Sequence, residues 1–265
     1  MKNIISIIIL FLFWSCELTP EFDNPLDPDN PEYETPETTI LGGPSEGEIV
    51  DESSVTFSWE GNEQAVVYST NLNNLGWSNW TSNTDITFDY LDEGGYTFQV
   101  KCKYSTGDED ESPAEINFTV DAIQGQSLRI YPLLTETTVN QTQTVSVFIE
   151  EVENVMTTEF DITYDPLLVT LQNVTEGELI TDFAGESVMI YDIIENDGYN
   201  SIQMNLGVAL GDNPGLTGTG SVVDIEFLPV SIGSFNIEVN DLAFRDYNNL
   251  EIPVNQIVNG RFEVE

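Results

Sequence analysis

Of the residue types that most often act in catalysis or metal binding, this sequence contains many carboxylates, two cysteines and no histidine. Its 265 residues include 47 aspartates and glutamates, no histidine and two cysteines, Cys16 and Cys102. The lack of imidazole excludes Ser-His-Asp and Cys-His catalysis as well as imidazole metal sites. A glycosidase needs two carboxylates, but among 47 acids such pairs arise by chance, and no catalytic signature accompanies them. We therefore expect a protein that is not an enzyme.

Two loops are rich in the oxygen ligands that hard cations prefer. One contains Asp246, Asn248 and Glu251, and the other contains Asp197 and Asn200. Calcium binding requires these oxygens to converge, and neither loop fits the EF-hand pattern. We expect no cofactor, with a structural calcium at the first loop as the alternative.

The charge of the chain restricts its partners. Six lysines and arginines against 47 acids give a formal net charge of −41. Such a surface repels phosphate backbones and anionic lipid head groups. We therefore expect no nucleic-acid binding, and a solvated surface typical of a secreted protein.

The segment Trp77-Ser78-Asn79-Trp80-Thr81 has two interpretations. Trp77 and Trp80 could form an aromatic platform on which sugar rings stack. Alternatively, both side chains lie along a β-sandwich and pack against neighbouring side chains. The first interpretation predicts carbohydrate binding, and the second a structural role.

The elements that position these residues are predicted to be strands. Apolar residues, 40% of the chain, recur mainly in short alternating stretches between turn residues, which is typical of half-buried strands. Stretches of this kind span 55–59, 64–69, 86–90, 96–100 and 112–121, and Cys102 is expected to be a small core residue. Leu91, a glycine turn and Tyr96 resemble the tyrosine corner of fibronectin-III and immunoglobulin-like sandwiches. We assign residues 40–121 to such a module.

The N-terminus predicts export. Residues 4–14 form an apolar run of 11 residues, too short to span a hydrocarbon core of about 30 Å, so that residues 1–16 are expected to be a signal peptide. Phe13-Trp14-Ser15-Cys16 resembles the lipobox of bacterial lipoproteins, which implies lipidation of Cys16 and attachment to the bacterial outer membrane or cell surface. An ordinary secretory signal is the alternative. Residues 17–39, acidic and proline-rich, are expected to be a disordered linker.

The rest of the chain, 126–265, is predicted to form a second sandwich. Nine strands are expected at 128–131, 144–149, 158–164, 169–174, 188–194, 201–206, 222–228, 234–239 and 260–264. Turn signals separate these short strands, which favours two stacked sheets of jelly-roll type. The predicted fold class is therefore all-β, with two β-sandwich domains.

Six segments of the second domain, in order, resemble the cohesin domain family. They are Thr144-Val145-Ser146-Val147-Phe148-Ile149, the strand and turn from Glu159 through Tyr164-Asp165-Pro166 to Val169, Val174-Thr175-Glu176-Gly177-Glu178-Leu179, the glycine-led segment 218–227, Asp241-Leu242-Ala243-Phe244-Arg245-Asp246, and Val258-Asn259-Gly260-Arg261-Phe262-Glu263-Val264. The resemblance covers about 140 residues. Independently of it, Pro166 lacks a donor and Asp165 can cap a turn, so the strand is expected to end there.

This resemblance implies a docking module that captures dockerins, which are small calcium-loaded modules that attach enzymes or other cargo. In the family one open sheet face binds the partner, and the strand before Tyr-Asp-Pro contributes to it. Alternation places Thr157, Glu159, Asp161 and Thr163 outward, and Glu159 matches the family's key acidic position. Plain solvation of this face is the alternative. For the whole protein we expect capture of a dockerin-like module or another secreted protein. A connection with polysaccharide degradation is a further hypothesis, and direct carbohydrate binding is the alternative.

Overall fold

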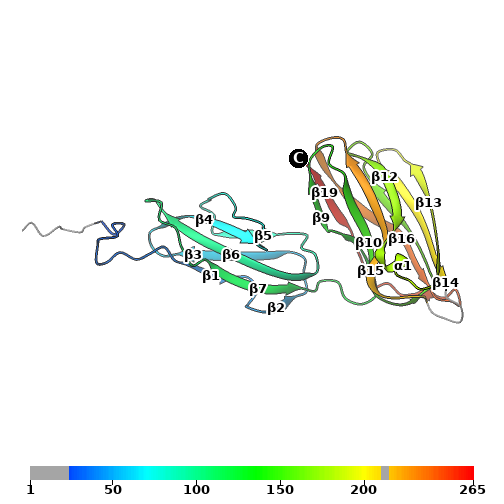
Figure 1. Ribbon diagram of the computed structural model, residues 1–265, viewed down its shortest axis with the longest axis horizontal. Coiled ribbons are helices and arrows are strands. Elements are labelled where there is room, and N and C mark those ends of the chain that lie inside the picture. Colours follow the sequence, from blue (N-terminus) through cyan, green and yellow to red (C-terminus); the bar gives the residue numbers. More distant parts are fainter. Residues whose placement is uncertain (1–23, 210–214) are drawn as a thin grey trace, which may run out of the picture.

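The computed structural model describes residues 24–209 and 215–265, and nearly all regular structure in them is β-strand (Figure 1). The all-β prediction is confirmed. Cys16 and the expected signal peptide lie outside the described residues. Within them, no helix has the length and apolar character that crossing a membrane requires.

The N-terminal module contains two sheets. One has the order β1-β3-β5 and the other β2-β7-β6-β4. Their bounds are β1 Thr38–Gly42, β2 Glu48–Val50, β3 Val55–Gly61, β4 Ala65–Leu72, β5 Asp85–Phe88, β6 Gly94–Tyr104 and β7 Ala114–Val120.

Aromatic side chains fill the core between these sheets. The rings of Phe57 and Phe98 stack with centroids 3.9 Å apart, and Cys102 is a free, fully buried thiol. The hydroxyl of Tyr96 donates a hydrogen bond of 2.9 Å to the carbonyl oxygen of Asp92. This contact is the tyrosine corner expected from the sequence.

The end of the expected linker packs against this module. Tyr104 donates a hydrogen bond of 3.0 Å to the carbonyl of Glu34, and Thr38, in β1, donates one of 2.8 Å to the buried carboxylate of Asp110. The rings of Tyr33 and Tyr104 meet edge to face. This corrects the expectation of a disordered spacer up to residue 39, because a proline-rich, non-periodic segment gives no sign of such contacts.

The C-terminal domain is a sandwich of two larger sheets. One has the order β12-β15-β10-β8-β18, and the other β13-β14-β11-β16-β19-β9 with β17 beside β16. Their bounds are β8 Ser127–Tyr131, β9 Leu134–Thr137, β10 Gln143–Val155, β11 Thr157–Tyr164, β12 Val169–Glu176, β13 Glu186–Glu195, β14 Asn200–Ala209, β15 Leu216–Pro229, β16 Gly233–Arg245, β17 Glu251–Ile252, β18 Gln256–Val258 and β19 Gly260–Val264, with one short helix, α1, at Glu178–Thr181.

The strand prediction for this domain is confirmed at all nine stretches, although several strands are longer than predicted. Apolar side chains from both sheets fill the space between them, among them the fully buried Phe160, Ile162, Phe227 and Phe262. The rings of Phe227 and Phe262 meet edge to face at 6.2 Å. Three short strands, β9, β17 and β18, were not predicted.

A buried ion pair lies where the two domains meet. Arg129 on β8 binds Glu150 on β10 through its Nε, and both side chains are almost fully buried. Asp92, from the tyrosine corner of the first module, lies 3.7 Å from Nη1 of Arg129 and accepts a 2.9 Å hydrogen bond from the amide of Leu133. Burial raises the pKa of Asp92, while the Leu133 amide and the Arg129 charge oppose that shift. The arginine thus connects the core of one domain with the corner of the other.

We predict that Arg129→Met destabilises the second domain by about 3–5 kcal/mol, because Glu150 would remain buried without a counter-charge. Replacing both Arg129 and Glu150 by methionine should restore most of that loss. Denaturant unfolding followed by circular dichroism measures the difference.

Arg261→Met is the control, since Arg261 pairs with the partly exposed Glu263 and should change stability by less than about 1 kcal/mol. Equal losses for Arg129→Met and Arg261→Met would contradict the prediction.

Candidate functional site

The four residues predicted to face outward on β11 lie on the outer face of the sheet β13-β14-β11-β16. Along β11, Phe160 and Ile162 are 0% exposed, whereas Thr157 and Glu159 are exposed and Asp161 and Thr163 are half-buried on the opposite side. The alternation expected from the sequence is therefore present. We call this surface the β11 face.

The strand register brings polar side chains into rows across the β11 face. Glu159 lies opposite Asn205 of β14 and Ala243 of β16. One row further along, Asp161 accepts a hydrogen bond of 3.2 Å from the side chain of Gln203 on β14. Side chains that lie opposite each other on neighbouring strands are close enough to interact.

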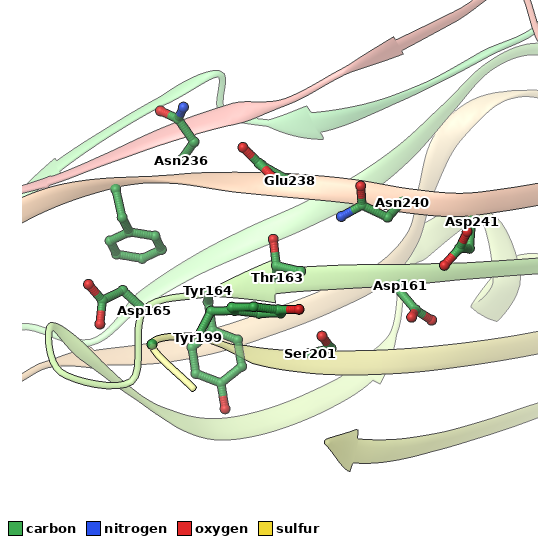
Figure 2. A pocket seen from close by; sticks show the side chains of 12 residues that line it. Asp161, Thr163, Tyr164, Asp165, Tyr199, Ser201, Asn236, Glu238, Asn240 and Asp241 are labelled. Atoms are coloured by element: carbon green, nitrogen blue, oxygen red, sulfur yellow. The ribbon is translucent and has the colours of Figure 1, made fainter. Parts of the chain in front are cut away.

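At one end of the face, β11, β14 and β16 border an open groove of about 660 Å³. Figure 2 shows Asp161 and Thr163 on their strand between Ser201 on one side and Glu238 and Asn240 on the other. The groove is lined by Asp161, Thr163, Tyr164, Asp165, Gly198, Tyr199, Ser201, Phe235, Asn236, Glu238, Asn240 and Asp241. No cationic side chain is among these lining residues.

A β-bulge in β16 shapes the wall of this groove. Asp161 pairs with Asn240 and Glu159 with Ala243, so that β16 has one residue more than β11 over this stretch. Asp241, within the bulge, has φ 53°, a left-handed conformation that aspartate tolerates better than most residues. The extra residue reverses the alternation, so that Ala243 and Arg245 also face outward.

The other end of the β11 face is partly apolar. A shallower hollow of about 300 Å³ is lined by residues that include Glu159, Val188, Ile190, Ala243 and Arg245. Val188 and Ile190, on β13, are 60% and 63% exposed. In the described part of the chain, the side chains of Glu159 and Arg245 form no ion pair, which leaves both charges available to a partner.

The turn after β11 follows the sequence prediction. The carboxylate of Asp165 accepts a hydrogen bond of 2.8 Å from the amide of Leu167, and the strand ends at Tyr164. The hydroxyl of Tyr164 accepts a hydrogen bond of 3.4 Å from Asn200, beside the groove. The Tyr-Asp-Pro segment therefore closes one end of the face.

Trp77 and Trp80, the candidate sugar platform, lie beside lysines of β6. Nζ of Lys103 is 3.9 Å from the ring centre of Trp80, and Nζ of Lys101 is 4.8 Å from that of Trp77. Both ammonium groups also bind the carboxylate of Glu109, that of Lys101 at 2.7 Å and that of Lys103 at 2.9 Å. These contacts lower the pKa of Glu109. The lysines cover one face of the rings, and this geometry favours the packing interpretation.

The oxygen-rich loop after β16 is organised as a turn. Oδ1 of Asp246 accepts hydrogen bonds of 2.8 Å from the amides of both Asn248 and Leu250, while Glu251 enters β17. Among the described residues, no three His, Cys, Asp or Glu side chains are grouped as a metal site would require. Calcium at this loop stays a prediction.

Several residues of the β11 face were missed from the sequence. Asn236, Glu238 and Asn240 on β16 alternate with the buried Phe235, Ile237 and Val239, so period-two patterning could have identified them. Period-two patterning could not have identified Arg245, because the bulge at Asp241 shifts the alternation between Asn240 and Arg245 by one residue.

Comparisons with known proteins support the two-domain interpretation. Residues 134–264 match the model of the Cohesin domain family, and residues 52–121 match the Y_Y_Y domain, an immunoglobulin- or fibronectin-III-like module. The resemblance proposed from the six segments is confirmed by the first match. A search of curated proteins finds no match.

Solved structures similar to the chain include cohesins. A non-cellulosomal cohesin from the archaeon Archaeoglobus fulgidus is 20% identical, covering 54% of this chain and 92% of its own, with a TM-score of 0.43. A chain of a type I cohesin–dockerin complex from Clostridium thermocellum is 16% identical, covering 54% and 100%, with a TM-score of 0.44. A type II cohesin domain from the cellulosome of Acetivibrio cellulolyticus is also 16% identical, covering 52% and 95%, with a TM-score of 0.43.

For the tryptophan pair, we predict that Trp80→Ala destabilises the first module by about 1 kcal/mol or more, because a cation–π contact and its packing are lost. Retention of the chain on insoluble cellulose should be the same before and after the substitution. Tyr247→Ala is the control, since Tyr247 is 77% exposed. Reduced retention at unchanged stability would instead favour the sugar platform.

Proposed function

We propose that the second domain, which carries the Cohesin family match at residues 134–264, is a docking module for a dockerin-type protein partner. The observation that carries this proposal is the continuous β11 face, on which Glu159 stands outward at the centre of four paired strands. The role is binding and not catalysis.

The composition of the face suits a protein partner. Val188 and Ile190 offer apolar contact at one side, and polar side chains of β11, β14 and β16 occupy the rest. Stable protein interfaces bury about 800 Å² on each partner and combine apolar with polar contacts. A four-stranded face with strands of eight to thirteen residues gives enough area for such an interface.

The charges of the face select the partner. Glu159, Asp161, Glu238 and Asp241 are acidic, and Arg245 is the cation beside them in this part of the described structure. A docking surface with positive potential would be attracted at long range and would associate faster at low salt. We therefore expect the dockerin-type partner to present basic residues to this face.

The remainder of the chain positions this module at the cell surface. Lipidation of Cys16 would attach the protein to the bacterial outer membrane, and the first sandwich would then lie between the anchor and the docking domain. A partner that carries a polysaccharide-degrading enzyme would in this way be held at the cell. The lipobox-like sequence at Cys16 and the family match in the second domain support this arrangement.

We predict that Glu159→Lys weakens binding of a dockerin-containing protein secreted by the same organism by at least about tenfold, because it places a cation at the centre of the face and opposes a basic partner. Isothermal titration calorimetry with the intact chain measures the change.

Glu153→Lys is the matched control. Glu153 is exposed on β10, in the opposite sheet, and its replacement changes the net charge of the chain by the same amount. Binding that is equally weakened by both substitutions would show an effect of overall charge, and unchanged binding by Glu159→Lys would reject the β11 face.

For the anchor, we predict that Cys16→Ser removes the chain from the membrane fraction and abolishes incorporation of a labelled fatty acid, because the acylated thiol is lost. Cys102→Ser, at the buried thiol of the first module, should leave both measurements unchanged. Continued fatty-acid labelling of Cys16→Ser would contradict lipidation at this position.

A further inference from the structure

Strand β13 is an unusual edge of the second sandwich. Among the described strands, the other edges of its two sheets are short or irregular. The strands β17, β18 and β9 have two, three and four residues, and the pairing of β12 with β15 is interrupted between Leu171 and Asn173. By contrast, β13 pairs with β14 over ten consecutive residues without a break in register. Short strands and bulges are common means by which proteins prevent an edge from pairing with another chain.

The side chains of β13 protect this edge only in part, because a single carboxylate, that of Asp192, binds an outward amide, that of Ile193. The strand Glu186–Glu195 contains no lysine or proline, the residues most often used to block strand addition, and its charged residues are the acids Glu186, Asp192 and Glu195. Ile190 is 63% exposed on one side of the strand, and Tyr191 and Ile193 are 42% and 43% exposed on the other. A long, regular edge with exposed apolar residues on both sides is suited to accepting a further strand.

The hairpin between β13 and β14 shows which backbone groups of β13 are free to bond an added strand. The amide of Asn196 donates to the carbonyl of Tyr199 at 3.0 Å, so that Asn196 and every second residue before it bond to β14. The residues between them, Met189, Tyr191 and Ile193, therefore turn their N–H and C=O groups away from β14. Consistent with this, the amide of Ile193 is bonded to the side chain of Asp192 at 2.9 Å.

We propose that β13 is a second interaction site, which adds an extended strand from a basic partner protein to the sheet. The occupant alternates apolar residues with small polar ones and carries lysine or arginine at both ends. Its basic ends are required by the acids along β13, namely Glu186, Asp192 and Glu195. A second copy of this chain fits less well, because each copy carries a net charge of −41.

This site is distinct from the β11 face. Docking on the face uses side chains that point out of the sheet, whereas strand addition uses backbone groups in its plane. The proposal therefore does not depend on the dockerin-binding function, and Glu159→Lys should leave strand addition intact.

The test is site-resolved amide hydrogen exchange of the intact chain with the peptide Lys-Lys-Val-Thr-Val-Thr-Val-Lys-Lys as probe. We expect the amides of Met189, Tyr191 and Ile193 to exchange at least about tenfold more slowly with peptide. The same peptide N-methylated at alternate valine and threonine residues has equal charge but cannot complete the ladder, and it should give no protection.

Tyr191→Pro should abolish the protection of Met189 and Ile193, because it removes an outward amide without removing a bond to β14. Tyr191→Thr keeps the amide and is its matched control. Two results would overturn the proposal: unprotected β13 amides, and equal protection by the N-methylated peptide. Protection that rises with the concentration of the chain alone would assign the edge to a second copy and would overturn it as well.

Discussion

The pleat of β11 is the constraint on which the candidate site depends. Phe160 and Ile162 are held between the two sheets with no exposed surface, and a slip of one residue would move both into water. Fully burying a side chain of this size contributes about 1.5–3 kcal/mol. Because the inner residues fix the register so strongly, the outward direction of Glu159 and Asp161 is fixed with them. The core thus determines which residues of β11 form the outer face.

The sequence predicts a strand well only where alternation of apolar and polar residues continues over several residues. The long strands β10, β11 and β14 show period-two alternation over most of their length and were predictable. By contrast, β17 and β18 have two and three residues, too few to show a period. The bulge at Asp241 carries no signal of this kind, since aspartate is common in turns as well as in bulges. Contacts between distant residues, such as Arg129 with Asp92 or Tyr104 with Glu34, depend on the packing of completed elements and cannot be derived from spacing.

The few cations of the chain show how its acidic surface is organised. In the described residues, Lys101 and Lys103 both bind Glu109, Arg129 binds Glu150, and Arg261 binds Glu263. These pairs are internal to one domain or lie where the domains meet, so they neutralise acids that the fold itself brings together. Arg245 differs, because it lies beside the hollow of the β11 face without an ion pair. Together with Glu159 it gives that end of the face both signs of charge, a feature that adds specificity to association more than affinity.

The same charge would oppose pairing between two copies of this chain along the open edge of β13. Edge strands are usually kept apart by a lysine, a proline or a bulge placed on the strand, and β13 has none of them. A net charge of −41 on each copy makes two copies repel each other. Salt screens this repulsion beyond about 8 Å at physiological ionic strength. Repulsion of this kind is general and not local, so it excludes other acidic chains while leaving the backbone of β13 free for a basic one. The acidity of the chain would thereby oppose pairing of this edge with a second copy and favour the basic partner proposed for it.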